Sequence, residues 1–484
     1  MSVVNPLVRS MRMVVDVLDM RAKWLLILLV LAACSDDASK DPQQDVIDIP
    51  RDQIQPSQPW SAPEIVAEGA VGLHLQLVEL GSRGAVAFFS TSGREDGPCE
   101  ELGLDDPPLR VRWTLSYAER TASGWVSEVV TEPLYVAEPP GLSLGAQEDG
   151  TVLLAAMTGE PIAAYRYCGA NNVGLLQRQG PGQWSLTTVV SQSGEAATGE
   201  PASDFGQVVG YFPSLAFAPD GSAGIAYKDV HAGGMQSDDF RRADLELALR
   251  SPGGAWRALA VDHGRGAGNH NVLRFDADNQ PYIAYINPSE DVQARLGLWV
   301  SRPKIADDGW ERVQLYNRRT VGGPAARFIG VDSPSYHVAF YNADRGFPVL
   351  AQLLDPDNFD DLGVGWTLEE LGDPRFDEGY FPALAVGPGG EVAMAYYRCT
   401  QSNAAQLGDC SADVDALVFA WRDGKGWNYE VVDEGDLYGA CGMNPSLVIT
   451  AGGVAQIAYR CERWDADAQQ LVAQVRFVQR RALP

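Results

Sequence analysis

The stretch "GYFPSLAFAPDGSAGIAY" (210–227) decides the fold, because the chain repeats it with few changes as "GYFPALAVGPGGEVAMAY", ending at Tyr396. Each copy places two short apolar segments on either side of a turn that contains Pro, Asp or Gly. Glycine supplies the positive φ that hairpin turns need, so the phrase predicts a two-stranded β-hairpin.

Weaker relatives of the phrase recur along the chain, about 60 residues apart, and each ends near an aromatic residue. They are "GAVAFFS" (84–90), "EPIAAYRYC" (160–168), "SAGIAYKD" (222–229), "QPYIAYIN" (280–287), "SYHVAFYN" (335–342), "EVAMAYYRC" (391–399) and "VAQIAYRC" (454–461). A second family alternates with the first, and each member begins near a Trp. Its members are "GWVSEVVTE" (124–132), "QWSLTTVVS" (183–191), "AWRALAVDH" (255–263), "GWERVQLYN" (309–317), "GWTLEELGD" (365–373) and "GWNYEVVDE" (426–434).

These repeats predict an all-β chain of seven four-stranded antiparallel units, which resembles a seven-bladed β-propeller of the kind found in secreted bacterial proteins. The resemblance covers residues 60–484. The last unit lacks a Trp strand, and an unused Trp phrase lies before the first unit. We therefore expect Trp60–Ala67 to pair antiparallel with Leu471–Val478 and close the ring. We call the four strands of each unit a, b, c and d in chain order, so that 210–227 supplies strands a and b and each Trp phrase supplies strand d. The aromatic residues of strand b and the Trp residues are expected to fill the spaces between blades.

The region before the repeats is expected to direct export. "MRAKWLLILLVLAACSDD" (20–37) has basic residues, an apolar run too short for a comfortable membrane span, and then Cys34. Its ending resembles the bacterial lipobox, which implies cleavage before Cys34 and lipidation of its thiol. We expect a signal peptide over 1–33, with Met20 as an alternative start, and a flexible tether over 34–59. The protein is then lipid-anchored in the cell envelope, at the outer membrane or cell surface.

The charge narrows the choice of partners. The formal net charge is −27, and such a surface repels phosphate backbones and anionic lipid heads. The sequence therefore excludes nucleic acid, limits membrane contact to the lipid anchor, and predicts a monomer.

Six cysteines remain once Cys34 is lipidated, an even number that suits disulfides in an exported chain. One predicted pair joins the two strands of a single hairpin, a second brackets one loop, and the third joins neighbouring blades. Free thiols or a metal site remain the alternative. The predicted pairs are Cys441 with Cys461, Cys399 with Cys410, and Cys99 with Cys168.

Loop lengths predict that one face of the propeller is elaborated and the other plain, because the long connections join strand b to c or strand d to the next a. Loops on a rigid scaffold commonly carry binding residues. The long connections are 90–108, 191–210, 228–243, 262–271 and 398–415.

Two groups of side chains are candidates on that face. Arg166, Arg398 and Arg460 follow b-strand aromatics; this arrangement resembles a sialidase-like propeller, which implies three arginines gripping a substrate carboxylate. The Ser-x-Asp opening of the sialidase Asp box is missing from every repeat. Structural ion pairs with the acidic surface are the alternative role for these arginines. The second group, from loops near the channel mouth, suits a sugar or peptide ligand: Tyr211, Tyr380, Asn269, His270, Asn271, Asp373 and Arg375.

Motifs for catalysis or metal binding are weak. "GLSLG" (141–145) lacks the strand–turn–helix setting of a nucleophilic Ser143, and metalloprotease, phosphate-loop and dinucleotide motifs are absent. "DPDNFDD" (355–361) offers carboxylates to Ca²⁺ but lacks the Gly and distal Glu of a calcium loop. We predict no cofactor, with Ca²⁺ as the alternative, and no catalytic residue. The predicted function is non-enzymatic binding or scaffolding of a protein or glycan; the alternative is a sialidase-like glycoside hydrolase or a lectin.

Overall fold

The computed structural model divides the chain into two compact units, Met1–Gln58 and Pro59–Pro484. It describes residues 59–480 of the second unit, apart from 82, 96–109, 132–133, 137–139, 148, 161–169, 192–208, 231–242, 264–265, 289–294, 305–308, 319, 321, 331–333, 402–409, 411–414 and 436–438. The predicted signal peptide, tether and lipidated Cys34 lie outside the described residues. No helix in the described part of the chain is long and apolar enough to cross a bilayer.

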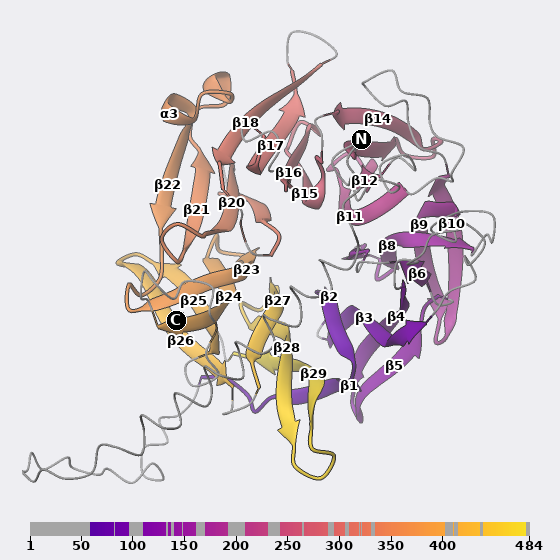
Figure 1. Cartoon of the computed structure of the whole chain (residues 1–484). Helices are drawn as coiled ribbons and strands as arrows, with labels where there is room; N and C mark the ends of the chain where they lie inside the picture. The colour runs from indigo at the N-terminus through magenta and orange to yellow at the C-terminus, as the bar shows by residue number, and fades with distance from the viewer. Residues whose placement is uncertain are drawn as a thin grey trace, which may run out of the picture. The chain divides into compact units, whose positions relative to one another are not determined.

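The second unit is a seven-bladed β-propeller of four-stranded antiparallel blades, as the repeats predicted (Figure 1). Blade 1 contains β2 (Val71–Leu80), β3 (Arg83–Glu95), β4 (Arg110–Thr121) and β5 (Gly124–Val129), and an extra strand, β6 (Leu134–Val136), pairs with β4. Blade 2 contains β7 (Leu142–Ala146), β8 (Val152–Glu160), β9 (Ala170–Gly180) and β10 (Gln183–Val190). Blade 3 contains β11 (Val209–Phe217), β12 (Ala223–Asp229), β13 (Asp244–Arg250) and β14 (Arg257–Asp262).

The remaining blades follow the same order. Blade 4 contains β15 (Asn269–Phe275), β16 (Pro281–Asn287), β17 (Gly297–Pro303) and β18 (Trp310–Tyr316). Blade 5 contains β19 (Ala325–Ile329), β20 (Ser335–Asn342), β21 (Phe347–Leu353) and β22 (Trp366–Glu370), with the short helices η4 (Pro356–Asn358) and α3 (Leu362–Gly365) before β22. Blade 6 contains β23 (Phe376–Val386), β24 (Val392–Gln401), β25 (Ala416–Asp423) and β26 (Gly426–Glu434). Blade 7 contains β27 (Cys441–Ile449), β28 (Ala455–Asp465), β29 (Gln470–Gln479) and β1 (Glu64–Gly69).

The ring closes because its first strand completes its last blade. β1 pairs antiparallel with β29, with Glu64 opposite Phe477 and Gly69 opposite Ala473, and Trp60 forms a further bridge to Arg480. The predicted closure is therefore confirmed. It covers the outer edge of β29, which would otherwise present unpaired N–H and C=O groups.

The hydrophobic core is divided among the interfaces between blades. Among the described residues, eight clusters of buried side chains each join neighbouring blades, for example Ile225 and Tyr227 of blade 3 with Leu153 and Leu175 of blade 2. Tyr227 is fully buried, as are its equivalents Tyr396 and Tyr459, which confirms their predicted packing role. Each blade therefore buries apolar side chains against both of its neighbours.

The Trp strands add a repeated polar contact between blades. The indole of Trp60 donates to Glu430 of blade 6 (3.0 Å), and that of Trp125 donates to Glu64 of the closing strand (3.0 Å). An arginine from the neighbouring c strand completes each group; Arg120 Nε lies 3.0 Å from Glu64. Trp184, Glu128 and Arg178 repeat the arrangement between blades 1 and 2. Other Trp strands lack this contact: Trp366 donates to Phe359 O, and the indoles of Trp256 and Trp427 have no hydrogen-bond partner among the described residues.

Two details differ from the sequence prediction. The b strand of blade 2 is β8, which pairs with β7 and β9, and not the predicted "EPIAAYRYC" (160–168). Ala156 of β8 occupies the register position that Tyr227 has in blade 3. Because the prediction looked for an aromatic residue at this position, it selected Tyr165, nine residues too late. The c–d connection of blade 5 is also long, because residues 354–365 carry η4 and α3.

The structure contains two of the predicted disulfides, Cys399–Cys410 and Cys441–Cys461. The second joins register partners at the start of β27 and in β28, as expected for cysteines facing each other across a hairpin. Cys99 and Cys168, the third predicted pair, lie outside the described residues.

Replacing Trp60 with alanine tests the closing strand. Trp60 is 8% exposed and packs edge-on against Phe419 with ring centroids 5.0 Å apart. Trp60→Ala is expected to lower the free energy of unfolding by about 3–5 kcal/mol, because it leaves a cavity and removes the indole donor from Glu430. Urea denaturation followed by tryptophan fluorescence and circular dichroism measures the change. Trp464→Ala, at a side chain that is 42% exposed, is the control; equal losses in the two variants would contradict the closure.

Candidate functional site

Five inner strands begin with the same local irregularity. In each, one residue adopts a positive φ close to 50°, and the pairing with strand b shifts register at that point. Such a bulge re-aims a side chain that strand alternation would otherwise send elsewhere. We call these residues the mouth ring: His74, Phe212, His270, Phe381 and Asn444.

The mouth ring is strained, because left-handed backbone is unfavourable for a bulky side chain and persists only where the surroundings impose it. Glycines of preceding blades make room for two of its members. A Cβ on Gly141 would lie 2.8 Å from the Cα of Phe212, and one on Gly322 would lie 2.7 Å from the Cα of Phe381. Pro140 O also accepts a hydrogen bond from the N–H of Phe212 at 2.6 Å. Neighbouring blades therefore hold these bulges in place.

The mouth ring lines a cavity of about 450 Å³ where the inner strands begin, on the face that receives the d–a connections. Rings from three blades meet there. The Phe212 and His270 ring centroids are 4.3 Å apart, and His74 stacks on His270 at 5.7 Å with an interplanar angle of 20°. We call this space the mouth cavity.

Both histidines of the mouth cavity are neutral at pH 7. Burial lowers the pKa of His74 to about 4 and that of His270 to about 3, where the neighbouring His74 and Lys228 add unfavourable charge. Neutral imidazoles offer one donor and one acceptor each, and a flat face for stacking. The mouth cavity therefore presents rings and neutral polar groups.

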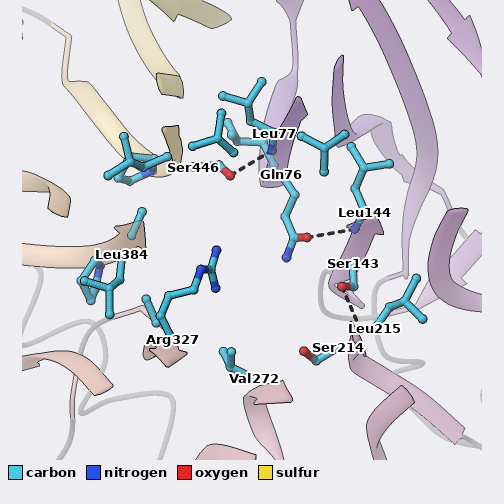
Figure 2. Close-up of a pocket in the computed structure, with 18 of the residues that line it drawn as sticks. Gln76, Leu77, Ser143, Leu144, Ser214, Leu215, Val272, Arg327, Leu384 and Ser446 are labelled. Atoms are coloured by element: carbon cyan, nitrogen blue, oxygen red, sulfur yellow. Dashed lines mark hydrogen bonds between the residues drawn. The ribbon is translucent and has the colours of Figure 1, made fainter. Parts of the chain in front are cut away.

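A second cavity, of about 390 Å³, continues from the first along the centre of the ring and shares lining residues such as Gln76, Asn271 and Pro382. We call it the channel cavity. Its wall includes Arg274 and Arg327, and Figure 2 shows the Arg327 side chain extending from β19 into the space enclosed by the labelled residues.

Side chains on the inner strands tie neighbouring blades together along the channel cavity (Figure 2). The Ser143 hydroxyl accepts the N–H of Leu215 at 2.9 Å, and the Gln76 amide oxygen accepts the N–H of Leu144 at 2.9 Å. The hydroxyls of Ser446 and Ser214 accept from Leu77 and Leu273 in the same way. Ser143 therefore serves as an acceptor between blades 2 and 3.

The structure brings three of the predicted binding residues to the mouth cavity: His270, Asn271 and Arg460. The Asn271 amide nitrogen donates to Gly268 O at 3.1 Å, whereas its buried oxygen accepts no hydrogen bond from the described residues. The Arg460 guanidinium donates to Val71 O (3.1 Å) and to the carboxylate of Glu462 (2.5 Å).

Other candidates have structural contacts. Tyr211 and Tyr380 lie within bulged strands and not in loops, and both are buried; Tyr380 donates to Asp377 at 2.8 Å and stacks on Tyr341. Asn269 accepts from the buried ammonium of Lys228. None of these three lines the mouth cavity.

The remaining arginines are not gathered into one cluster. Arg398 lies 2.9 Å from the buried carboxylate of Glu378, which in turn accepts from Tyr396, and its guanidinium stacks over Phe376. Arg375 is highly exposed and pairs with Asp373, lowering the pKa of that carboxyl to about 2. Arg166 lies outside the described residues. Arg398 and Arg375 are not part of the mouth cavity.

Groups that suggested metal binding have other partners. Asp355 and Asp361 of the acidic stretch cap the turns that begin η4 and α3. Asp433 approaches the sulfurs of Cys441 and Cys461, but these are joined to each other in a disulfide and are not free ligands.

Comparisons with known proteins find similarity in architecture only. No family model matches the chain, and no curated protein matches it. Among solved structures, a Dyadobacter fermentans protein of unknown function is 11% identical over 70% of this chain and 94% of its own, with a TM-score of 0.43. A leech intramolecular trans-sialidase is 8% identical over 86% and 92%, with a TM-score of 0.40. The NanB sialidase of Streptococcus pneumoniae is 11% identical over 88% and 71%, with a TM-score of 0.41. At this level of similarity the comparison says nothing about activity or ligand.

Gly141→Ala is expected to lower the free energy of unfolding by about 1–3 kcal/mol more than Gly150→Ala. Both glycines have positive φ, 77° and 85°, so the backbone cost of alanine is shared. Only at Gly141 would the new Cβ meet a neighbouring backbone; nothing lies within 4 Å of it at Gly150. Thermal and urea unfolding of the two variants measure the difference, and equal losses would show that the mouth ring is not packed as described.

The neutral histidines predict a loss of stability in acid. The pKa of a free histidine is 6.5, whereas the pKa values of these two in the folded protein are about 4 and 3. Between pH 6.5 and about 4 the unfolded chain therefore binds protons that the folded protein does not bind. The free energy of unfolding falls as the pH falls through this window. The double variant His74→Asn/His270→Asn, which copies the Asn444 position, should lose on the order of 1–2 kcal/mol less over this window, because the rings are partly exposed and the full pKa shift is screened. Urea midpoints at pH 6.5 and 4 measure it; parallel curves would refute the assignment.

Proposed function

We propose that the protein is a non-enzymatic binding module that takes a carbohydrate in the mouth cavity. The observation that carries this proposal is the mouth ring, in which strained bulges of five blades place four aromatic rings and one amide around the same cavity. Backbone strain that is repeated at one place is typical of a site with a function.

The chemistry of the mouth cavity suits a sugar. The rings of Phe212, Phe381 and His270 offer flat apolar faces, on which the C–H faces of a pyranose stack. The Asn271 oxygen and the Asn444 amide supply hydrogen-bonding groups for hydroxyls. A cavity of about 450 Å³ holds one or two sugar rings.

Binding without hydrolysis is favoured by the same side chains. Glycosidases generally use two carboxyl groups, one as acid and the other as base or nucleophile. Among the described residues lining the mouth cavity, none is Asp or Glu. The two histidines have pKa values of about 4 and 3, too low for efficient proton transfer near pH 7.

The cellular setting belongs to the proposal as well. A lipid on Cys34 would tether the propeller to the envelope, where glycans are available. The lipobox-like sequence before Cys34 supports this part, and labelling with a fatty-acid analogue in wild type and Cys34→Ser tests it.

Glycan-array screening, followed by calorimetry with the best ligand, tests the binding function. Phe381→Asn removes one stacking ring but keeps a residue that tolerates positive φ, and it should weaken binding about tenfold or more. Leu354→Asn, at a side chain that is 58% exposed in the c–d connection, is the matched control and should bind normally.

Two outcomes would contradict the proposal. One is the absence of saturable binding to any carbohydrate by the folded protein. The other is turnover of a glycoside reporter that Phe381→Asn abolishes, which would establish an enzyme.

A further inference from the structure

We propose that the channel cavity is an anion site, in which Arg274 and Arg327 bind the carboxylate or sulfate group of an acidic saccharide. This inference rests on the proposed carbohydrate binding for the identity of the ligand, but not for the existence of the anion site. The two arginines come from β15 and β19, the inner strands of blades 4 and 5, and both line the channel cavity.

The first argument is the number of donors that remain available. A guanidinium has five N–H donors. Arg274 donates to Ala326 O at 2.9 Å and to Leu273 O at 2.6 Å, and Arg327 donates to Ala326 O at 2.8 Å. These contacts use two of the five donors of Arg274 and one of the five of Arg327, and both residues line the channel cavity.

The second argument is the lack of a carboxylate counter-charge. Among the described residues, no Asp or Glu forms an ion pair with Arg274 or Arg327. Glu79 is the acidic residue in the described lining, and it accepts the N–H of Ala451. Burial lowers the pKa of Arg274 to about 10, so its guanidinium keeps its charge at pH 7. Two partly buried guanidiniums without a carboxylate partner favour an anion from solution.

The third argument is an asymmetry in the ring. Between blades 7 and 1, 1 and 2, 2 and 3, and 3 and 4, a serine or glutamine side chain accepts the N–H of the next inner strand. The corresponding residues of blades 4, 5 and 6 are Val272, Ala325 and Ala383, which have no acceptor.

The N–H groups that those side chains would satisfy belong to Ala326, Leu384 and Leu447. These three residues occupy the register position that Leu215 has in β11. The N–H of Leu215 donates to Ser143 of the preceding blade and so points away from strand b. The equivalent N–H groups therefore face the channel side. Donors and arginines thus lie on the same half of the ring. The other half carries the serine and glutamine oxygens. An oxyanion is the chemistry that complements the first half.

The net charge of −27 disfavours loose, non-specific binding of anions to the protein surface. An acidic surface repels free anions at a distance, so the channel arginines hold an anion through contact geometry. A saccharide already stacked in the mouth cavity would deliver its acidic group at high effective concentration, because the two cavities share lining residues.

The test compares a galacturonate trimer, a sulfated galactose trimer and a neutral galactose trimer by calorimetry at fixed ionic strength. The wild-type protein should bind at least one acidic trimer about 10- to 100-fold more tightly than the neutral one. Arg327→Gln should remove this preference. It is the primary variant because Arg327 has fewer structural contacts than Arg274. Arg345→Gln, at an arginine that is 59% exposed, makes the same change in charge and should keep the preference.

Soaking crystals in selenate tests the anion site without a sugar, since selenium is located by its anomalous scattering. A peak between Arg274 and Arg327 that Arg327→Gln removes supports the site, even if every trimer fails to bind and the carbohydrate proposal falls. Equal affinity for acidic and neutral trimers, together with no selenate in the channel cavity, overturns the anion site and leaves carbohydrate binding intact.

Discussion

The pairing of β1 with β29 is the constraint on which the rest of the structure depends. Each blade buries its apolar faces only against its neighbours, so an open array would expose one face of blade 1 and one of blade 7. Closing the ring buries Val66 and Phe477 at this seam and brings Glu64 to Trp125 and Arg120 of blade 1. It also places the starts of all seven inner strands around one centre.

Because the inner strands converge, side chains from several blades can line one cavity at the centre of the ring. Seven inner strands reach the same level, so a bulge at an equivalent position in several of them aims several side chains at one space. Below that level, the register places either side-chain acceptors or main-chain N–H groups of the same strands at the channel. A mouth cavity of rings therefore lies above a channel cavity with charge on one half. Proteins place such polar groups where a rigid scaffold holds them in register.

The sequence predicted the architecture well because the repeats carry it directly. The strand b phrase and the Trp phrase marked most blades, and the leftover Trp60 indicated the closure. Blade 2 was misaligned because Ala156 replaces the expected aromatic, so the search settled on Tyr165 nearby. The hairpin disulfide followed from adjacency within one repeat, which sequence alone can establish.

The candidate site was harder to predict, because it depends on which side chains the bulges turn inward. Tyr211 and Tyr380 were chosen as candidates, yet the next residue in each case, Phe212 and Phe381, enters the mouth ring. A signal was present: a glycine lies two positions before each mouth-ring residue, as Gly210 does before Phe212. The channel arginines had no such marker. Arg274 and Arg327 became visible only once the register showed which residues face the centre.

Residue-resolved hydrogen exchange of β29 tests the central claim most directly. With β1 on one side and β28 on the other, every amide from Ala473 to Phe477 should be protected, because both edges of the strand are paired. If alternate amides in this stretch exchange as fast as those of an exposed edge strand, β29 is an edge, the ring is open, and the account of the mouth and channel cavities is wrong.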